Sequence, residues 1–189
     1  MKLLILSFLV LATTGACRPP SATVTEKGEI LKIVKERVVK LAQPASDAQD
    51  AKPSKNNSPL KSASDEVAAL ESKKYLFLYF SAHWCPPCRQ FTPKLVDFYN
   101  KNAKNGDFDL IFVSADRSIE EMADYMSSTK MPWFAIPPKS DIVKALGEKF
   151  KVEYIPHLVL LGKDGEVLAK GKDEALQKYL ESHPVKEGP

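Results

Sequence analysis

The stretch that decides the fold is "YLFLYFSAHWCPPCRQFTP", Tyr75 to Pro93. It opens with a continuous apolar run of strand length, which is typical of a strand buried on both faces of a sheet. The two prolines that follow suit the first turn of a helix, and apolar side chains then recur at helical spacing to about Lys104. Cys85 and Cys88 therefore lie where a buried strand ends and a helix begins.

The rest of the C-terminal half alternates strands with helices. Further strands are predicted for Asp109–Ala115, His157–Leu161 and Glu166–Gly171, and further helices for Ser118–Ser128, Ser140–Phe150 and Asp173–Ser182. The helix from Ser118 has a capping box, with Glu121 three residues on. Met131–Pro138 is predicted as a loop, Lys163–Gly165 as a hairpin turn, and Asp65–Ser72 as a short helix or turn. This order predicts an α/β fold with a central mixed sheet flanked by helices on both faces.

Length and composition indicate one domain. The chain has 189 residues, of which 44% are hydrophobic, enough for one full core. We expect this domain to span 65–183, with a tail over 184–189. The 27 basic and 24 acidic side chains are spread along the sequence without a block of one sign, so we expect no nucleic-acid partner. We also expect a monomer.

The N-terminus has the pattern of an export signal. Met1–Ala16 contains one lysine, an apolar run from Leu3 to Ala12 and then small residues. The run is far below the roughly 20 residues that a membrane-spanning helix needs, so a signal peptide over 1–16 is predicted. The "TGAC" that ends at Cys17 resembles the lipobox of bacterial lipoproteins, although Thr14 stands where that pattern usually has leucine. The same residues suit ordinary signal-peptidase cleavage.

The count of cysteines favours lipidation of Cys17. Pairing Cys85 with Cys88 leaves Cys17 as the odd one of three, and a free thiol is a liability in an exported protein. We therefore expect an exported protein, lipid-anchored on the periplasmic side of a bacterial membrane. A plain secreted or soluble periplasmic protein is the alternative.

The segment 17–64 is expected to join the lipid anchor to the domain. Gln43–Ser64 is rich in Pro, Ser, Ala, Asn and Lys, with almost nothing apolar, and is predicted as a flexible tether or a loop insertion. The preceding "EILKIVKERVVKLA" suits either a helical stripe or two short strands. We predict an edge strand at least over Arg37–Leu41.

The Cys85–Cys88 spacing has three interpretations. A zinc site needs four ligands, and no second C-x-x-C accompanies this pair, so metal binding is not predicted. A permanent staple is disfavoured because a disulfide that closes so small a loop constrains little of the unfolded chain. A redox-active pair remains, and it needs no metal or organic cofactor.

The two cysteines are expected to have different roles. Cys85 lies at the start of the helix, where backbone N–H groups and the helix dipole stabilise a thiolate, so it should be the attacking sulfur. Cys88 lies one turn inside the helix, where it can resolve a mixed disulfide. Pro86 and Pro87 remove two backbone donors and stiffen the turn.

The W-C-P-P-C motif after a buried strand, with an Ile-Pro before a later strand, resembles the thioredoxin fold. The segments "YFSAHWCPPCRQFTPKLVDFYN", "MPWFAIP" and "FKVEYIPHLVLL" resemble, in order, those of the tryparedoxin and nucleoredoxin branch. On spacing alone Pro156 is an edge-strand proline. The resemblance implies instead that Pro156 is a cis-proline packed beside the disulfide, that Ile155 offers its backbone to an extended substrate segment, and that Trp84 and Trp133 border the active sulfur.

The resemblance also shows where this chain departs from thioredoxin itself. Thioredoxin has a buried aspartate in the strand before the cysteines, and Tyr79 stands there instead, as in the tryparedoxin branch. Proton handling then falls elsewhere: Glu153 is a candidate, and a plain surface carboxylate is the alternative. His157 replaces the usual small hydroxyl residue of the family and either tunes the thiolate or caps a strand.

These observations predict a thiol–disulfide oxidoreductase that exchanges disulfides with protein substrates through Cys85 and Cys88. Its electron donor or acceptor is not identified by the sequence. One alternative is a binding module on a thioredoxin scaffold whose cysteines are idle. The other is a thiol peroxidase, which is disfavoured because peroxidatic sites usually have a threonine and an arginine around one cysteine.

Overall fold

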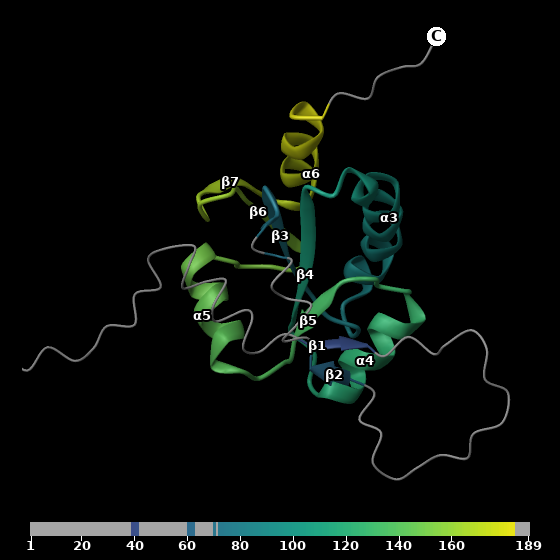
Figure 1. Cartoon of the computed structure of the whole chain (residues 1–189). Coiled ribbons are helices and arrows are strands. Elements are labelled where there is room, and N and C mark those ends of the chain that lie inside the picture. The colour runs from purple at the N-terminus through teal and green to yellow at the C-terminus, as the bar shows by residue number, and fades with distance from the viewer. Residues whose placement is uncertain (1–38, 42–59, 63–69, 71, 184–189) are drawn as a thin grey trace, which may run out of the picture.

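The computed structural model describes residues 39–41, 60–62, 70 and 72–183 (Figure 1). Its strands are β1 (Val39–Leu41), β2 (Leu60–Ser62), β3 (Tyr75–Ser81), β4 (Phe108–Ser114), β5 (Phe134–Ile136), β6 (His157–Leu161) and β7 (Val167–Lys170). Its helices are α3 (Pro86–Asn102), the 3₁₀ turn η1 (Ala103–Asn105), α4 (Ile119–Ser128), α5 (Asp141–Phe150) and α6 (Lys172–Glu181).

The strands form one seven-stranded mixed sheet in the order β2-β1-β5-β4-β3-β6-β7. Strands β3, β4 and β5 are parallel, and the other pairings are antiparallel. At its centre Tyr79 of β3 lies between Phe112 of β4 and Leu158 of β6. The predicted fold class is confirmed.

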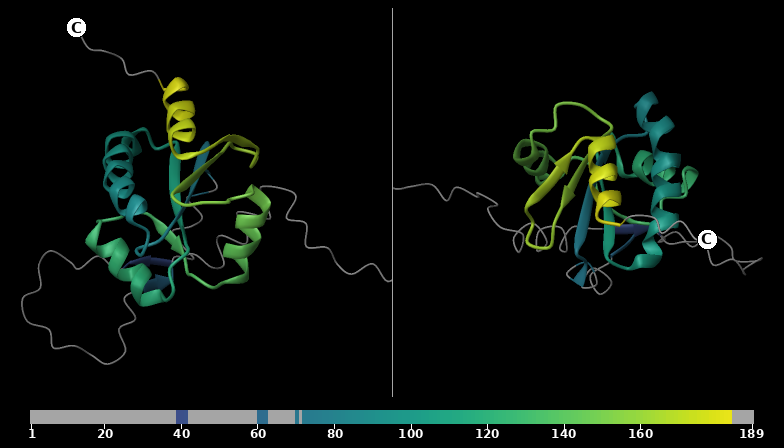
Figure 2. Two further views of the ribbon diagram at one scale, coloured as in Figure 1. Left: turned by 180° about the vertical axis from the view of Figure 1, so that it is seen from behind. Right: turned by 90° about the horizontal axis from the view of Figure 1, so that it is seen from above.

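The two faces of the sheet bury two separate cores, because side chains alternate between faces along each strand. Phe77 and Tyr79 face a core shared with α3, α4 and α6, whereas Leu78 and Phe80 face a core shared with α5. Figures 1 and 2 show α5 alone on one side of the sheet and the other helices on the opposite side. Because central strand β3 is buried on both faces, it reads as an uninterrupted apolar run.

The helix ends follow the capping signals of the sequence. The Ser118 hydroxyl accepts a hydrogen bond from the Glu121 backbone N–H at 3.2 Å. The Glu121 carboxylate in turn accepts one from the Arg117 backbone N–H at 3.0 Å.

Within the described residues the predicted strands and helices C-terminal to residue 74 all form, with ends shifted by at most two residues. Of the helix or turn predicted for Asp65–Ser72, Leu70 and Ser72 are described, and both are helical.

Three predictions about irregular or edge segments were wrong. Met131–Pro138 was predicted as a loop, but Phe134–Ile136 forms β5 beside β4. The strand predicted for Arg37–Leu41 is present over Val39–Leu41, but it is not at the edge of the sheet, because Leu60–Ser62 pairs on its outer side. Strand β2 (Leu60–Ser62) is the edge strand, and it lies in the segment that was predicted as a tether. The sheet therefore begins before the expected domain boundary at residue 65. Strands of three residues are too short to show a hydrophobic period, and distant pairing partners stabilise them.

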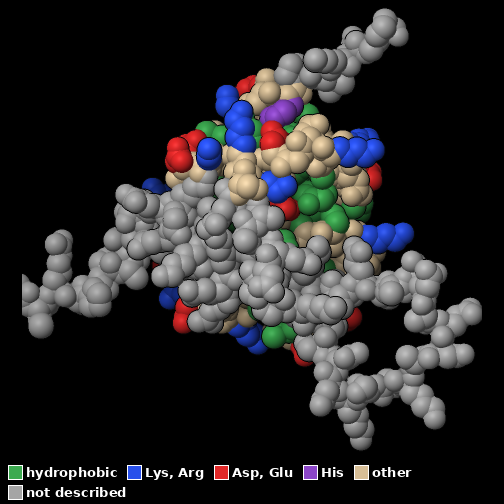
Figure 3. Space-filling model, in the orientation of Figure 1, with side chains coloured by type: hydrophobic (Ala, Val, Ile, Leu, Met, Phe, Trp, Pro, Cys, Tyr) green, Lys and Arg blue, Asp and Glu red, His purple; other side chains and the backbone are tan. Residues whose placement is uncertain are grey.

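The helices and the surface charges bear on the expectations about a membrane span and a nucleic-acid partner. None of the described helices is both long and apolar enough to cross a membrane. Basic and acidic side chains are intermingled on the face seen in Figure 3. The predicted signal peptide over 1–16, Cys17 and the tail over 184–189 lie outside the described residues.

Helix α6 closes the end of the sheet where β3 and β4 begin. Asp107, just before β4, accepts a hydrogen bond from the Tyr179 hydroxyl at 3.0 Å, and its other carboxylate oxygen lies 2.6 Å from His183 Nε2. The His183 ring stacks on Tyr179, and Tyr75 packs edge-on against both rings. These residues lie at the end of β3 and β4 opposite the turn that contains Cys85. We refer to Tyr75, Asp107, Tyr179 and His183 as the far end.

Candidate active site

The turn between β3 and α3 places Cys85 at the N-cap of the helix. Cys85 has an extended backbone, and Pro86 and Pro87 occupy the first two helical positions. Prolines fit there because the N–H groups of the first turn have no partner within a helix. The first free amide is therefore that of Cys88, and it donates to Cys85 Sγ at 3.3 Å.

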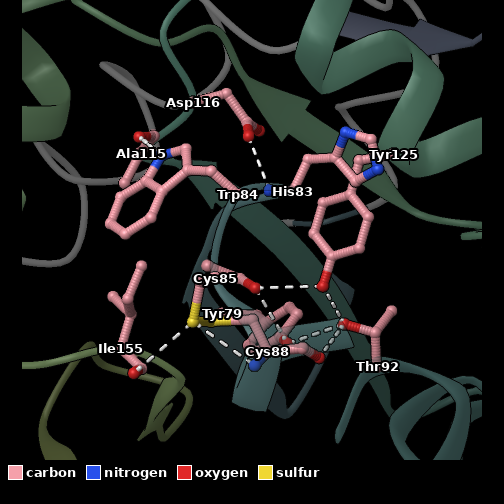
Figure 4. The surroundings of a disulfide bond; sticks show 11 residues. Tyr79, His83, Trp84, Cys85, Cys88, Thr92, Ala115, Asp116, Tyr125 and Ile155 are labelled. Atoms are coloured by element: carbon pink, nitrogen blue, oxygen red, sulfur yellow. Dashed lines mark hydrogen bonds between the residues drawn. A yellow bond between two sulfur atoms is a disulfide. The ribbon is translucent and has the colours of Figure 1, made fainter. Parts of the chain in front are cut away.

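Cys85 and Cys88 form a disulfide across one helical turn, with 5.2 Å between their Cα atoms (Figure 4). Cys85 is 4% exposed and Cys88 is completely buried. Cys85 Sγ also lies 3.8 Å from the backbone oxygen of Ile155. Cys85 is thus the more accessible of the two cysteines.

The electrostatics of this turn suit thiolate chemistry. When the disulfide is reduced, the N-cap position puts Cys85 Sγ at the positive end of the α3 dipole and within reach of the Cys88 amide. Such a position lowers the pKa of a thiol in general. No acidic residue lies in the first turn of α3 to oppose this effect.

The segment before β6 lies beside the disulfide, as the resemblance implies. The Ile155–Pro156 peptide bond is cis, and Pro156 is buried. The Ile155 side chain packs against Ala82, Cys85 and Cys88. The structure therefore brings Ile155 and Pro156 together with the two cysteines.

The two tryptophans lie in different surroundings. Trp84 is 48% exposed, and its indole N–H donates to the backbone oxygen of Ala115 at 3.0 Å, which anchors the ring next to Cys85 (Figure 4). Trp133 does not border the active sulfur. It is buried in the core on the α3 side of the sheet, where its ring packs edge-on against Tyr99.

The two proposed tuning residues do not contact the cysteines in the described structure. Glu153 is exposed. His157 pairs in register with Phe80, so its side chain lies on the α5 face of the sheet, opposite α3. Burial, together with the positive charge of Lys170, lowers the pKa of His157 below its ordinary value. These positions favour a surface role for Glu153 and do not support direct tuning of the thiolate by His157.

Beneath Cys88 lies a cluster of four buried hydroxyl groups that sequence reasoning missed. Thr92 donates to the Cys88 backbone oxygen at 2.9 Å and lies within hydrogen-bond distance of the Tyr79 and Tyr125 hydroxyls, while Ser81 donates to Tyr79. Each hydroxyl supplies one donor, so one consistent pattern runs from Ser81 through Tyr79 to Thr92 and the Cys88 carbonyl. Burial raises the pKa of Tyr79 well above its ordinary value, so the Tyr79 hydroxyl keeps its proton.

The buried carboxylate at this end of the sheet is Asp116, which the sequence analysis did not single out. One carboxylate oxygen accepts from the His83 backbone N–H at 2.6 Å, and the other accepts from the Ser114 hydroxyl at 2.8 Å. The bond from His83 joins the loop after β4 to the loop before Cys85 (Figure 4). Burial raises the pKa of Asp116 above its ordinary value. Its position directly after a buried strand that ends beside β3 was the available sequence signal.

Three exposed apolar side chains lie on segments at the end of the sheet that carries the disulfide. Trp84 follows β3, Ile119 begins α4 after β4, and Tyr154 precedes β6, so all three lie on segments that meet at this end of the sheet. The other large exposed hydrophobic residues among the described ones, Val167 and Leu180, lie on β7 and α6. The described residues contain no group of three or more His, Cys, Asp or Glu side chains that would hold a metal ion.

A buried strand, a helix-capping cysteine pair and an adjacent cis-proline define a thioredoxin-type dithiol site. The chain belongs to the thioredoxin-like family, whose model matches residues 73–167. The expected likeness to the tryparedoxin and nucleoredoxin branch is confirmed.

Its relatives include probable nucleoredoxin 1 of Arabidopsis thaliana, 42% identical over 60% of this chain and 20% of that protein. They also include tryparedoxin of Trypanosoma brucei brucei, 45% identical over 48% of this chain and 62% of that protein. The matches thus span less than two thirds of these relatives. Among solved structures, tryparedoxin I from Leishmania major is similar with a TM-score of 0.54 and 40% identity, over 64% of this chain and 84% of that one.

Proposed function

We propose that this protein is a thiol–disulfide oxidoreductase that acts on protein substrates, with Cys85 as the attacking and Cys88 as the resolving sulfur. The observation that carries the proposal is the Cys85–Cys88 disulfide at the N-cap of α3, with Cys85 the more accessible cysteine and Ile155 beside it. The exposed apolar side chains of Trp84, Ile119 and Tyr154 support a protein substrate, because a small disulfide would not cover so wide a surface.

The reaction follows from these positions in two balanced steps. The Cys85 thiolate attacks one sulfur of a substrate disulfide, which forms a mixed disulfide and releases the other substrate sulfur as a thiolate. The Cys88 thiolate then attacks Cys85 Sγ, which closes the Cys85–Cys88 disulfide and releases the second thiolate. Two electrons pass from the enzyme dithiol to the substrate, and both steps are reversible. The direction of flow depends on the reduction potential of the partner.

Reduction of insulin disulfides by the reduced protein tests this function. The wild type should be active, and Cys85→Ser should lower the rate on the order of a thousandfold, because the nucleophile is lost. Cys88→Ser should accumulate mixed disulfides that non-reducing gels display. Mixed disulfides that form through Cys88 in Cys85→Ser would reverse the assigned roles. A wild-type protein that is inactive toward insulin would favour the idle binding module, and faster turnover of hydrogen peroxide would favour a thiol peroxidase.

We further propose that the protein is exported and anchored by lipidation of Cys17. The support is the "TGAC" pattern after the apolar run of Met1–Ala16 and the odd cysteine that it leaves. A bacterial lipoprotein with several acyl chains is held stably in a membrane. Mass spectrometry of the mature N-terminus should find a diacylglyceryl group on Cys17, and Cys17→Ala should release the protein from membranes. An unmodified N-terminus would leave only the secreted alternative.

A further inference from the structure

Tyr154 is an exposed aromatic side chain beside the residue that contacts the disulfide. At 65% exposure it is the most exposed of the large hydrophobic residues in the described chain. The next residue, Ile155, has its backbone oxygen 3.8 Å from Cys85 Sγ. A single exposed apolar residue is common on protein surfaces, but this one is the chain neighbour of Ile155, whose side chain packs against both cysteines.

The Tyr154 ring is held by its surroundings. It packs edge-on against the His157 ring, with 5.5 Å between centroids and 79° between planes. His157 is only 6% exposed and lies within the β6–β3 ladder, so it offers a fixed support. An aromatic side chain that is already held loses little conformational entropy when a partner packs on it.

The family resemblance implies that a substrate segment pairs with the backbone of Ile155, and strand geometry then sets its position relative to Tyr154. A substrate segment that lies along the backbone of Ile155 advances about 3.3 Å per residue. When the substrate cysteine is at Cys85 Sγ, the substrate residues on either side of it lie alongside the chain neighbours of Ile155. Tyr154 is one of these neighbours. Trp84 and Ile155 flank Cys85 in Figure 4, so Trp84 adds a second aromatic surface near the same sulfur.

We propose that Tyr154 is a specificity-determining residue, whose ring favours substrates with an aromatic residue next to the reacting cysteine. This inference rests on the proposed function and deepens it. Aromatic rings that pack edge-to-face or offset gain attraction beyond the burial of their area. A glycine at the same substrate position offers no such contact, so the ring should discriminate between the two.

The test uses two decapeptides, each with one cysteine held as a mixed disulfide with glutathione. Both residues that flank the cysteine are phenylalanine in one peptide and glycine in the other. Single-turnover rates are measured with pre-reduced protein. The Cys85 thiolate attacks the peptide sulfur and releases glutathione, and Cys88 then releases the peptide thiol, so one enzyme dithiol is consumed per mixed disulfide.

The wild type should reduce the phenylalanine peptide faster, and Tyr154→Ser should lower the ratio of the two rates about fivefold. Tyr154→Phe should keep the ratio, because it keeps the ring. Leu180→Ser, which removes an exposed apolar side chain from α6, is the matched control and should also keep it. Thermal melting curves check that the variants fold.

Three results would overturn the inference alone: a ratio unchanged in Tyr154→Ser, a ratio that rises because the ring had obstructed the site, or an equal drop in Leu180→Ser. A wild-type protein that reduces neither peptide would overturn the proposed function and this inference together. Because a structural defect would slow both peptides alike, the ratio separates a specificity role from a structural one.

Discussion

The two ends of strands β3 and β4 differ in how their aromatic and histidine side chains are placed. At the far end, Asp107, Tyr179 and His183 are bonded to one another, and their rings are stacked. At the disulfide end, which comprises residues 82–86, 115–119 and 151–157, Trp84 and Tyr154 are exposed. There the His157 ring is buried with no hydrogen-bond partner for either nitrogen among the described residues.

This contrast suggests a division between the two ends of the sheet: the far end stabilises the fold, and the disulfide end serves function. Unsatisfied buried polar groups and exposed aromatic rings cost stability, and proteins keep such features where a function needs them. Substitutions at the far end should therefore change the stability of the protein and leave its chemistry intact. Substitutions at the disulfide end should do the reverse, or even raise stability.

The largest effect on stability is expected for Tyr179→Ala at the far end. Tyr179 is completely buried and packs against Tyr75, Phe77 and Phe108. Truncation of a buried aromatic side chain costs about 3–5 kcal/mol of the free energy of unfolding. Urea unfolding measures the loss.

Two further measurements keep this prediction specific. Tyr179→Phe, which removes only the hydroxyl bonded to Asp107, should cost about 1 kcal/mol. The rate of insulin reduction per folded molecule should match the wild type in both variants. A variant that stays folded but loses activity would show that the far end influences the disulfide, and the contrast between the ends would fail.

The same contrast explains how far the sequence alone could predict the structure. The run Tyr75–Ser81 predicts β3 correctly, because a strand buried on both faces is apolar at every position. The cap at Ser118 is also local, since donor and acceptor lie three residues apart. The cysteine pair could be read for the same reason: spacing and the start of a helix are both visible in the sequence.

Features that depend on contacts between distant parts of the chain could not be predicted from the local sequence. Leu60–Ser62 is polar in composition, and its strand exists through its pairing with Val39–Leu41. Trp133 stands in a segment that resembles the family, but its burial against Tyr99 depends on the packing of α3. Asp116 looks like any loop carboxylate until its bond to the His83 backbone is seen.

A smaller effect, of opposite sign, is expected for His157→Leu at the disulfide end. The substitution replaces a buried ring that lacks hydrogen-bond partners with an apolar side chain of similar size. Removing the desolvated polar group should raise the free energy of unfolding by about 1–2 kcal/mol at pH 7. Chemical denaturation measures the difference. A loss of stability would mean that the ring nitrogens are paired in solution.

The same variant should also change how stability depends on pH. Because the pKa of folded His157 lies below its ordinary value of 6.5, the unfolded chain takes up a proton that the folded protein resists. The wild type should therefore lose stability as the pH falls from 6.5 toward the folded pKa, and His157→Leu should lose less over that range. Since the other groups titrate in both proteins, the difference between the two curves isolates His157. Parallel curves would contradict the prediction.

The smallest effect is expected for Lys151→Gly, at the start of the segment that leads to Ile155. Lys151 has φ +54° at the C-terminal end of α5, in the left-handed region that favours glycine. An L-residue there costs about 1–2 kcal/mol, and glycine loses about 0.5–1 kcal/mol through the entropy of the unfolded chain. The variant should therefore be more stable by about 0.5–1 kcal/mol, measured by urea unfolding.

Lys130→Gly and Lys139→Gly are the matched controls, because both lysines also have positive φ angles and lie outside the segment 151–157. All three variants should gain similar stability. If backbone strain at Lys151 serves the active site, its variant alone should reduce insulin more slowly while reacting normally with a small disulfide, since only the large substrate uses the backbone of Ile155. Equal activity in all three variants would show that the backbone strain at Lys151 has no role in the reaction. The features of the disulfide end that serve function would then be its side chains.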